Sequence, residues 1–138
     1  VNVTADVIVG FPTEDEAAFE RTLGFVREAG ITRVHAFSYS PRPGTAAAAL
    51  GDRVAPQEKK RRSRELRGLS EALSRRHRAA KLGEDVEVLV DKAAETQASG
   101  YTRDYVRVYL PPQGAPRGAV VQARVEDLYA DGVRAYPL

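Results

Sequence analysis

The spacing of apolar residues changes along the chain, and each change predicts a new element. Residues 3–9 form a nearly continuous apolar run that only Asp6 interrupts, a pattern typical of a strand buried on both faces of a sheet. Residues 13–30 place their apolar side chains at helical spacing, and residues 34–39 are rich in β-forming types. A strand, a helix and a strand with short links predict a βαβ unit with parallel strands.

The limits of the first helix are marked by residues that cap helices. Thr13 and Glu16 match the T-x-x-E capping box, in which the two residues satisfy free backbone donors at a helix start. Phe19 and Leu23 then fall on one helical face, and Gly30 provides a C-terminal stop. We therefore expect the helix to run between Thr13 and Gly30.

A second, longer helix is predicted from Pro56 to about Leu82. Proline suits the first helical position, and Gly83 ends the pattern. An apolar stripe at positions 66, 69, 73, 77 and 80 is narrow, and basic residues cover most of the remaining circumference. These basic residues are Lys59, Lys60, Arg61, Arg62, Arg64, Arg67, Arg75, Arg76, Arg78 and Lys81.

The basic helix dominates the charge distribution. Residues 59–81 carry a net charge of +8, although the whole chain carries only +2. Such asymmetry indicates a polyanionic partner for one segment, with Arg75, Arg76 and Arg78 as candidate RNA contacts. The alternative is a linker helix whose charged face is simply solvated.

From residue 84 onward the apolar period becomes two. Turn residues separate about five short segments that alternate apolar and polar positions. These expected strands lie near residues 86–91, 98–102, 105–110, 121–126 and 133–136. The pattern predicts a small antiparallel β-barrel of the OB kind, and so an α+β chain in which a βαβ unit and a long helix precede the barrel.

One predicted strand pair in this region interleaves aromatic and basic residues. The residues are Tyr101, Arg103, Tyr105, Arg107 and Tyr109. Tyrosine rings and guanidinium planes on a sheet face can stack on unpaired nucleobases. Ordinary cross-strand packing between tyrosine and arginine is the alternative.

Composition excludes several kinds of site. The 138 residues include no cysteine, so the chain itself offers no disulfide, thiolate nucleophile or cysteine-ligated metal. His35 and His77 lack a second ligand at metal spacing. No apolar run approaches the length of a membrane span. Because Val1 already leads into a strand and methionine is absent, we expect this to be a piece of a longer protein.

A stiff loop follows the second predicted strand. In the stretch VHAFSYSPRPGT, Pro41 and Pro43 end the strand and flank Arg42. This loop lies at the carboxyl end of the strand, where ligands bind in α/β folds; a plain turn with a solvated arginine is the alternative. Asp6, near the end of the first strand, is either a structural carboxylate or a ligand contact.

Several of these segments resemble one enzyme family. ADVIVGFPTEDEAAF and VHAFSYSPRPGTAAA resemble the end of the radical S-adenosylmethionine domain of the tRNA methylthiotransferases. VAPQEKKRRSRELRGLSEALS resembles their bridging helix, and EVLVD with SGYTRDYVRVYLP resembles their TRAM domain, a small RNA-binding barrel. The resemblance implies a radical-domain remnant over residues 1–55, a bridging helix over 56–82 and a TRAM barrel over 83–138.

The resemblance also implies roles for residues and partners. Asp6, Gly10 and Pro12 would face the cofactor, whereas Arg42, Gly44 and Thr45 would lie where substrate enters. Thr13 departs from the glycine usual in the family's G-F-P-G-E turn. The parent enzyme would use S-adenosylmethionine and four-iron four-sulfur clusters held by upstream cysteines, so this chain alone should bind neither and be inactive. Its partners would be the tRNA anticodon arm and the upstream domains, in the cytoplasm and without a membrane.

The branch of the family and two alternatives stay open at this point. RVHAFSYSPRPGT and GYTRDYVRV most resemble the enzymes that methylthiolate N6-threonylcarbamoyladenosine beside the anticodon. A sibling class modifies an aspartate of a ribosomal protein instead. A stand-alone RNA-binding module is the third possibility, although such a module would not need a βαβ unit.

Overall fold

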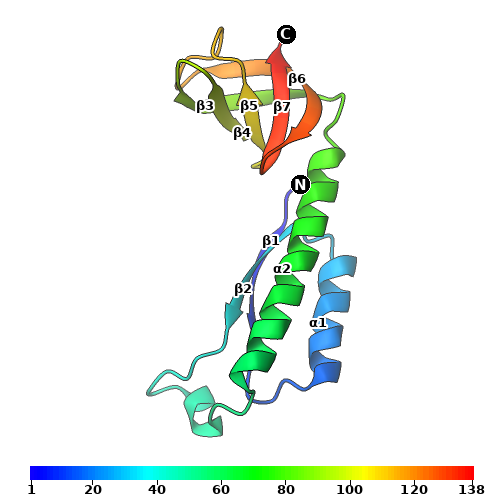
Figure 1. Ribbon diagram of the computed structural model, residues 1–138, viewed down its shortest axis with the longest axis vertical. Helices are drawn as coiled ribbons and strands as arrows, with labels where there is room; N and C mark the ends of the chain where they lie inside the picture. The colour runs from blue at the N-terminus through cyan, green and yellow to red at the C-terminus, as the bar shows by residue number, and fades with distance from the viewer. The chain divides into compact units, whose positions relative to one another are not determined.

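The structure is a computed structural model that describes all 138 residues. The chain divides into two compact units, one of residues 3–74 and the other of residues 1–2 with 75–138. The elements of the first unit are β1 (Thr4–Val9), α1 (Glu16–Glu28), β2 (Arg33–Ser38), the 3₁₀ helix η1 (Ala46–Leu50) and most of α2 (Pro56–Ala79). The second unit contains β3 (Asp85–Ala93), β4 (Ala98–Thr102), β5 (Arg107–Leu110), β6 (Val120–Tyr129) and β7 (Gly132–Pro137) (Figure 1).

The first unit is a two-stranded parallel sheet with helices packed against it. β1 and β2 pair in register with Asp6 opposite His35 and Ile8 opposite Phe37, so the predicted parallel βαβ unit is confirmed. Apolar side chains of α1 and α2, including Phe19, Leu23 and Leu66, form one buried cluster with the sheet.

Within this chain, the first strand is covered on one face only. Burial alternates along β1, with Val9 buried and Asp6 exposed. Ile8 and Phe37 on the open face are 57% and 52% exposed. Both helices supply side chains to the cluster on the other face, so this chain leaves one face of the sheet uncovered.

The predicted capping box at Thr13 and Glu16 is also wrong. The N-cap of α1 is Asp15, whose carboxylate accepts a hydrogen bond from the Ala18 N–H at 2.7 Å. Glu14 instead accepts from the backbone N–H of Gly10 at 2.7 Å. Aspartate is preferred to threonine at the N-cap position. The Glu14 carboxylate instead bonds the backbone just after β1.

α2 begins at Pro56 as predicted and ends at Ala79, three residues before the expected limit. Leu66 is buried, and Leu69 and Leu73 pack against the same cluster. Ser70 adds a polar tie, because its hydroxyl bonds both the N–H and the carbonyl of Val34 at 2.8 and 3.2 Å. No helix in the structure is both long and apolar enough to cross a bilayer.

The five strands of the second unit close into a barrel in the order β3-β4-β5-β7-β6. All neighbouring pairs are antiparallel except β5 and β7, which are parallel. The small barrel is thus confirmed, but its fully antiparallel pairing is not. Two glycines permit tight closure: a Cβ at Gly100 would overlap the carbonyl of Leu89, and one at Gly132 would overlap that of Arg107.

Candidate functional site

A row of aromatic and guanidinium groups lies on the outer side of the barrel. Tyr101 on β4 is directly opposite Arg107 on β5, and Tyr109 is opposite Arg134 on β7. Inward neighbours such as Val108 are fully buried, so strand alternation turns the tyrosines and arginines outward. We call this row the Tyr/Arg ladder. Its members are Tyr105, Tyr101, Arg107, Tyr109, Tyr129 and Arg134.

Successive members of the ladder are in contact. The Tyr105 and Tyr101 ring centres are 6.2 Å apart. The Arg107 guanidinium lies 5.0 Å from the Tyr101 ring centre and 5.7 Å from that of Tyr109. Tyr109 meets Tyr129 edge-on at 5.0 Å, and Arg134 lies 4.4 Å from the Tyr129 ring centre. The contacts form a continuous line from the β4–β5 turn to the β6–β7 hairpin.

Hydrogen bonds hold the centre of the ladder. Arg107 donates to the Tyr101 hydroxyl, and to the Ser99 hydroxyl at 3.2 Å. The Tyr109 hydroxyl donates to the Asp131 carboxylate, and this bond raises the pKa of Tyr109. Fixed rings and a fixed guanidinium lose little conformational entropy when a ligand stacks on them. The ladder is therefore preorganised as a stacking surface.

Tyr105 is the most exposed ladder member, at 79%. Its φ of 58° lies in the left-handed region, which bulky residues seldom adopt. The turn enforces it: the Thr102 hydroxyl accepts the Val106 N–H at 3.0 Å and donates to Asp104 at 2.7 Å. Strained backbone of this kind occurs most often at functional sites.

The same turn is tied to the end of α2 through Asp104. Its carboxylate lies 2.9 Å from the Lys81 ammonium and 3.3 Å from the His77 ring nitrogen. Partial burial tends to raise the pKa of Asp104, but the Thr102 hydroxyl and Lys81 outweigh burial and lower it to about 2. Asn2 adds a hydrogen bond to the Asp104 carbonyl at 2.6 Å. Asp104 is thus an ionised anchor beneath the exposed Tyr105.

The sequence-predicted platform and the observed ladder overlap only in part. Tyr101, Tyr105, Arg107 and Tyr109 are brought together. Arg103 is not in the ladder; it is 85% exposed and pairs with Glu87 at 2.8 Å. Sequence reasoning missed Tyr129 and Arg134, because only the parallel β5–β7 pairing places Arg134 beside Tyr109. The apolar alternation along β6 and β7 could have placed Tyr129 and Arg134 on the outer side of the barrel.

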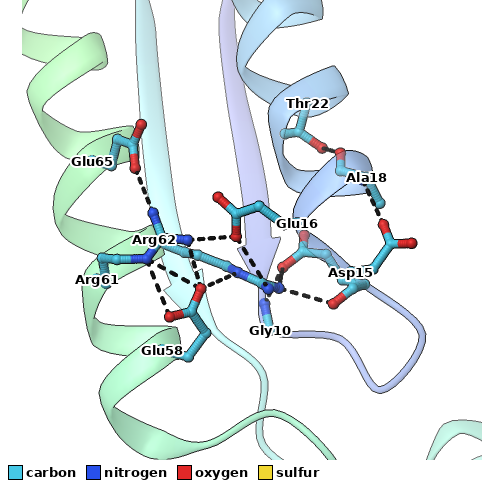
Figure 2. Close-up of polar contacts among 10 residues, drawn as sticks. Gly10, Asp15, Glu16, Ala18, Thr22, Glu58, Arg61, Arg62 and Glu65 are labelled. Carbon is cyan, nitrogen blue, oxygen red and sulfur yellow. Dashed lines mark hydrogen bonds and ion pairs between the residues drawn. The ribbon is translucent and has the colours of Figure 1, made fainter.

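The basic face of α2 is more neutralised than its sequence implies. Arg61 pairs with Glu16 at 2.6 Å and with Glu65 at 2.9 Å (Figure 2). Arg62 pairs with Glu14 at 2.8 Å. Glu58 bonds both arginines, and its bond to Arg61 is the main cause that lowers the pKa of Glu58 to about 2. Part of this face is therefore a structural ion-pair network.

The three predicted RNA contacts at the end of α2 differ in availability. Arg75 and Arg76 are exposed. Arg78 is only 8% exposed and donates to the Asp131 carbonyl at 3.1 Å, so it joins the helix to the β6–β7 hairpin. Arg75 and Arg76 are the accessible pair, and Arg78 has a structural role.

Of the predicted cofactor-facing residues, Gly10 and Pro12 follow the carboxyl end of β1, whereas Asp6 lies in the middle of the strand and not near its end as expected. Gly10 has a φ of 78°, and a Cβ there would overlap the Lys59 side chain. Lys59 is 7% exposed, donates to the Tyr39 carbonyl at 3.0 Å and pairs with Asp52. Pro12 is buried, whereas Asp6 is exposed on the open face. Of the three, only Asp6 therefore has an exposed side chain.

The predicted substrate-facing residues form a turn that leads into η1. The Thr45 hydroxyl donates to the Arg42 carbonyl at 2.8 Å and accepts the Ala48 N–H at 3.2 Å. Gly44 has a φ of 83°, which glycine adopts readily. Arg42 itself is exposed. The structure thus keeps Arg42 accessible while Thr45 holds the turn.

The side chains offer no metal site of the usual composition. No cluster of three or more His, Cys, Asp or Glu side chains is placed to hold an ion. Because the chain has no cysteine, it also supplies no thiolate for an iron–sulfur cluster.

Comparison with known proteins gives one consistent result. No family model matches the chain. It is 36% identical over 130 residues to the tRNA-2-methylthio-N(6)-dimethylallyladenosine synthase of Desulfitobacterium hafniense (strain Y51), covering 92% of this chain and 29% of the relative. The synthases of the same name from Nocardia farcinica and Geobacter metallireducens are 40% and 35% identical, over 81% and 98% of this chain.

These relatives are enzymes that act on tRNA by name, and all are much longer. The chain spans 24–30% of the length of the three relatives. Their names specify a dimethylallyladenosine product, so they support similarity to tRNA methylthiotransferases but not the threonylcarbamoyladenosine branch expected from the sequence.

Proposed function

We propose that the chain is part of an enzyme that methylthiolates an N6-modified adenosine next to the anticodon of tRNA. Similarity to such enzymes over 92% of the chain carries this proposal. In it, residues 1–55 supply part of the wall of the radical domain, residues 56–82 form a bridging helix, and residues 83–138 form an OB-like TRAM barrel. The enzyme would work in the cytoplasm.

The Tyr/Arg ladder supports an RNA-gripping role for the barrel. Sequence-specific RNA recognition commonly uses unstacked bases laid against aromatic rings and guanidinium planes. The ladder provides four tyrosines and two arginines in contact. Arg75 and Arg76 add accessible positive charge, which attracts the phosphate backbone without regard to sequence. The anticodon arm, with its single-stranded loop, suits both features.

The modified nucleoside has two candidates. The relatives favour N6-dimethylallyladenosine. The segments at residues 33–45 and 100–108 resemble the threonylcarbamoyladenosine branch, and they include the exposed Arg42 and Tyr105. Arg42 could pair with the carboxylate of a threonylcarbamoyl group, whereas a dimethylallyl group has no charge to pair with.

The cofactors implied by the resemblance fit this chain only in part. S-adenosylmethionine and four-iron four-sulfur clusters would supply the radical chemistry of the whole enzyme. Cluster ligands would have to come from other residues of a longer protein, because this chain has no cysteine. Asp6, on the open face of the sheet beside the exposed Ile8 and Phe37, is the residue through which this chain could contact S-adenosylmethionine. Further upstream strands of the same protein would cover that face.

The nucleoside content of cellular tRNA tests the proposal. Deletion of the coding region from the source organism should remove one 2-methylthioadenosine derivative from its tRNA, as measured by mass spectrometry of digested tRNA. Loss of the dimethylallyl or the threonylcarbamoyl derivative would decide between the two candidates. A tRNA nucleoside profile unchanged by the deletion, with an altered ribosomal-protein aspartate instead, would overturn the proposal and favour the sibling enzyme class.

A further inference from the structure

A small pocket opens on the barrel at one end of the Tyr/Arg ladder. Its volume is about 280 Å³. Its lining includes Thr96 and Gln97 from the β3–β4 turn, Pro111 and Pro112 after β5, and Arg134 and Tyr136 from β7. The Ala94 N–H bonds the Gln97 carbonyl at 3.0 Å, which closes the turn and places both of its polar side chains at the pocket.

The pocket is continuous with the ladder. Tyr109 and Arg134 line the pocket and are also ladder members. Arg134 stacks on Tyr129 and lies 3.6 Å from the Asp127 carboxylate. An RNA strand laid along the ladder would therefore bring its next base to the mouth of the pocket.

The walls combine flat apolar surface with free polar groups. Tyr136 is 42% exposed, and the two prolines form a stiff apolar wall. The side chains of Thr96, Gln97 and Tyr136 make no hydrogen bond to any other residue of the chain. The Gln97 amide offers a donor and an acceptor side by side, the pattern that pairs with the edge of a base. This chemistry matches a planar heterocycle with polar edges.

The volume of the pocket suits a ligand the size of a single base. Pockets for drug-sized ligands have volumes of about 300–1,000 Å³, and the present pocket lies just below that range at about 280 Å³. We propose that this pocket, formed by Gln97, Arg134 and Tyr136 with the proline wall, accepts a single unpaired nucleobase of the RNA bound along the ladder. The proposal rests on the RNA-binding role of the barrel and adds a site to it.

Binding of the full chain to a labelled RNA hairpin tests the pocket. The hairpin carries 2-aminopurine at single loop positions in turn, and a fully paired duplex of equal nucleotide number serves as the reference. Gln97→Ala and Tyr136→Ala should weaken hairpin binding about 5- to 150-fold, the range for loss of one stacked base. Both should abolish the fluorescence change of one loop base and leave duplex binding unchanged. Thermal unfolding of each variant checks its fold.

Two matched variants separate the possible outcomes. Gln122→Ala, at an exposed barrel position outside the pocket, should bind as wild type does. Tyr105→Ala removes a ladder residue that does not line the pocket, so it measures the contribution of the ladder alone. If Tyr105→Ala weakens hairpin binding while the pocket variants match wild type, the pocket proposal is overturned and the RNA-binding role stands. Equal weakening of hairpin and duplex by the pocket variants would also overturn it. If wild type binds no RNA, the pocket proposal and the RNA-binding role of the barrel are both overturned.

Discussion

The guanidinium of Arg107 lies 5.0 Å from the centre of the Tyr101 ring and also donates a hydrogen bond to the hydroxyl of that residue. One side chain thus holds its partner both through the ring and at the phenol oxygen. Because Tyr109 flanks Arg107 on the other side at 5.7 Å, Arg107 fixes the spacing of two tyrosines. The geometry requires the planar fork of arginine.

Replacement of Arg107 by lysine should therefore not be conservative. Lysine keeps the charge but lacks the planar fork whose two nitrogens donate separately to Tyr101 and Ser99, so Arg107→Lys should lower the free energy of unfolding by about 1 kcal/mol. Urea denaturation measures this change. Arg117→Lys, at an exposed position outside the ladder, is the control and should be neutral. Equal stability of the two variants would show that the stacking of Arg107 is incidental.

The anchor at Asp104 predicts a pH dependence. Its pKa in the folded chain is lowered to about 2, so its stabilising contribution is present at neutral pH and disappears as the pH falls from about 4 toward 2. Asp104→Asn should destabilise the chain at pH 7, and the difference from wild type should shrink toward pH 2. Thermal unfolding across this pH range, with Glu126→Gln as an exposed control, is the measurement. A difference independent of pH would contradict the ionised anchor.

Two glycines with positive φ provide a matched comparison. Gly10 and Gly30 have φ values of 78° and 69°, but only at Gly10 would a Cβ meet another group, the Lys59 side chain. Gly30→Ala should cost about 1–2 kcal/mol from backbone strain alone, and Gly10→Ala should cost more. When Lys59→Ala is already present, Gly10→Ala should cost only about as much free energy of unfolding as Gly30→Ala. Equal destabilisation by the two glycine variants would mean that Lys59 moves aside freely.

The β6–β7 hairpin offers a stabilising substitution. Ala130 has a φ of 48°, a conformation that glycine adopts without the penalty that alanine meets. Ala130→Gly should raise the free energy of unfolding by about 0.5–1 kcal/mol. Ala94→Gly, at an exposed turn position that does not have positive φ, should have the opposite sign. A loss of stability in Ala130→Gly would contradict the strained turn.

Local patterns predicted most of the fold. Alternation from residue 84 gave the barrel strands, and the segment 98–102 coincides with β4. The apolar alternation does not show which strands pair. β5 and β7 are parallel, and this pairing brings Arg134 beside Tyr109. The apolar run of β1 indicated a strand suited to burial on both faces, but it did not indicate which face the helices of this chain cover.

The candidate site was predictable to a similar degree. Tyr101, Tyr105, Arg107 and Tyr109 are near in sequence, so hairpin geometry sufficed to group them. The neutralisation of Arg61 and Arg62 was not predictable from the helix alone, since Glu14 and Glu16 reach them from the N-terminal region of α1. Charge counts within one window therefore overestimated the basic surface of α2.

Salt-dependent binding of the chain to a tRNA anticodon hairpin tests the RNA-binding role of the ladder most directly. Arg75→Ala with Arg76→Ala should flatten the slope of log affinity against log salt by about 0.7–0.9 for each phosphate that the variant no longer neutralises. Tyr105→Ala or Tyr109→Ala should weaken binding by about 1–3 kcal/mol and leave that slope nearly unchanged. Isotherms at several salt concentrations show both effects. The ladder is only cross-strand packing if two results are found together: wild type binds the hairpin no more tightly than a size-matched acidic polymer, and the tyrosine variants bind the hairpin as wild type does.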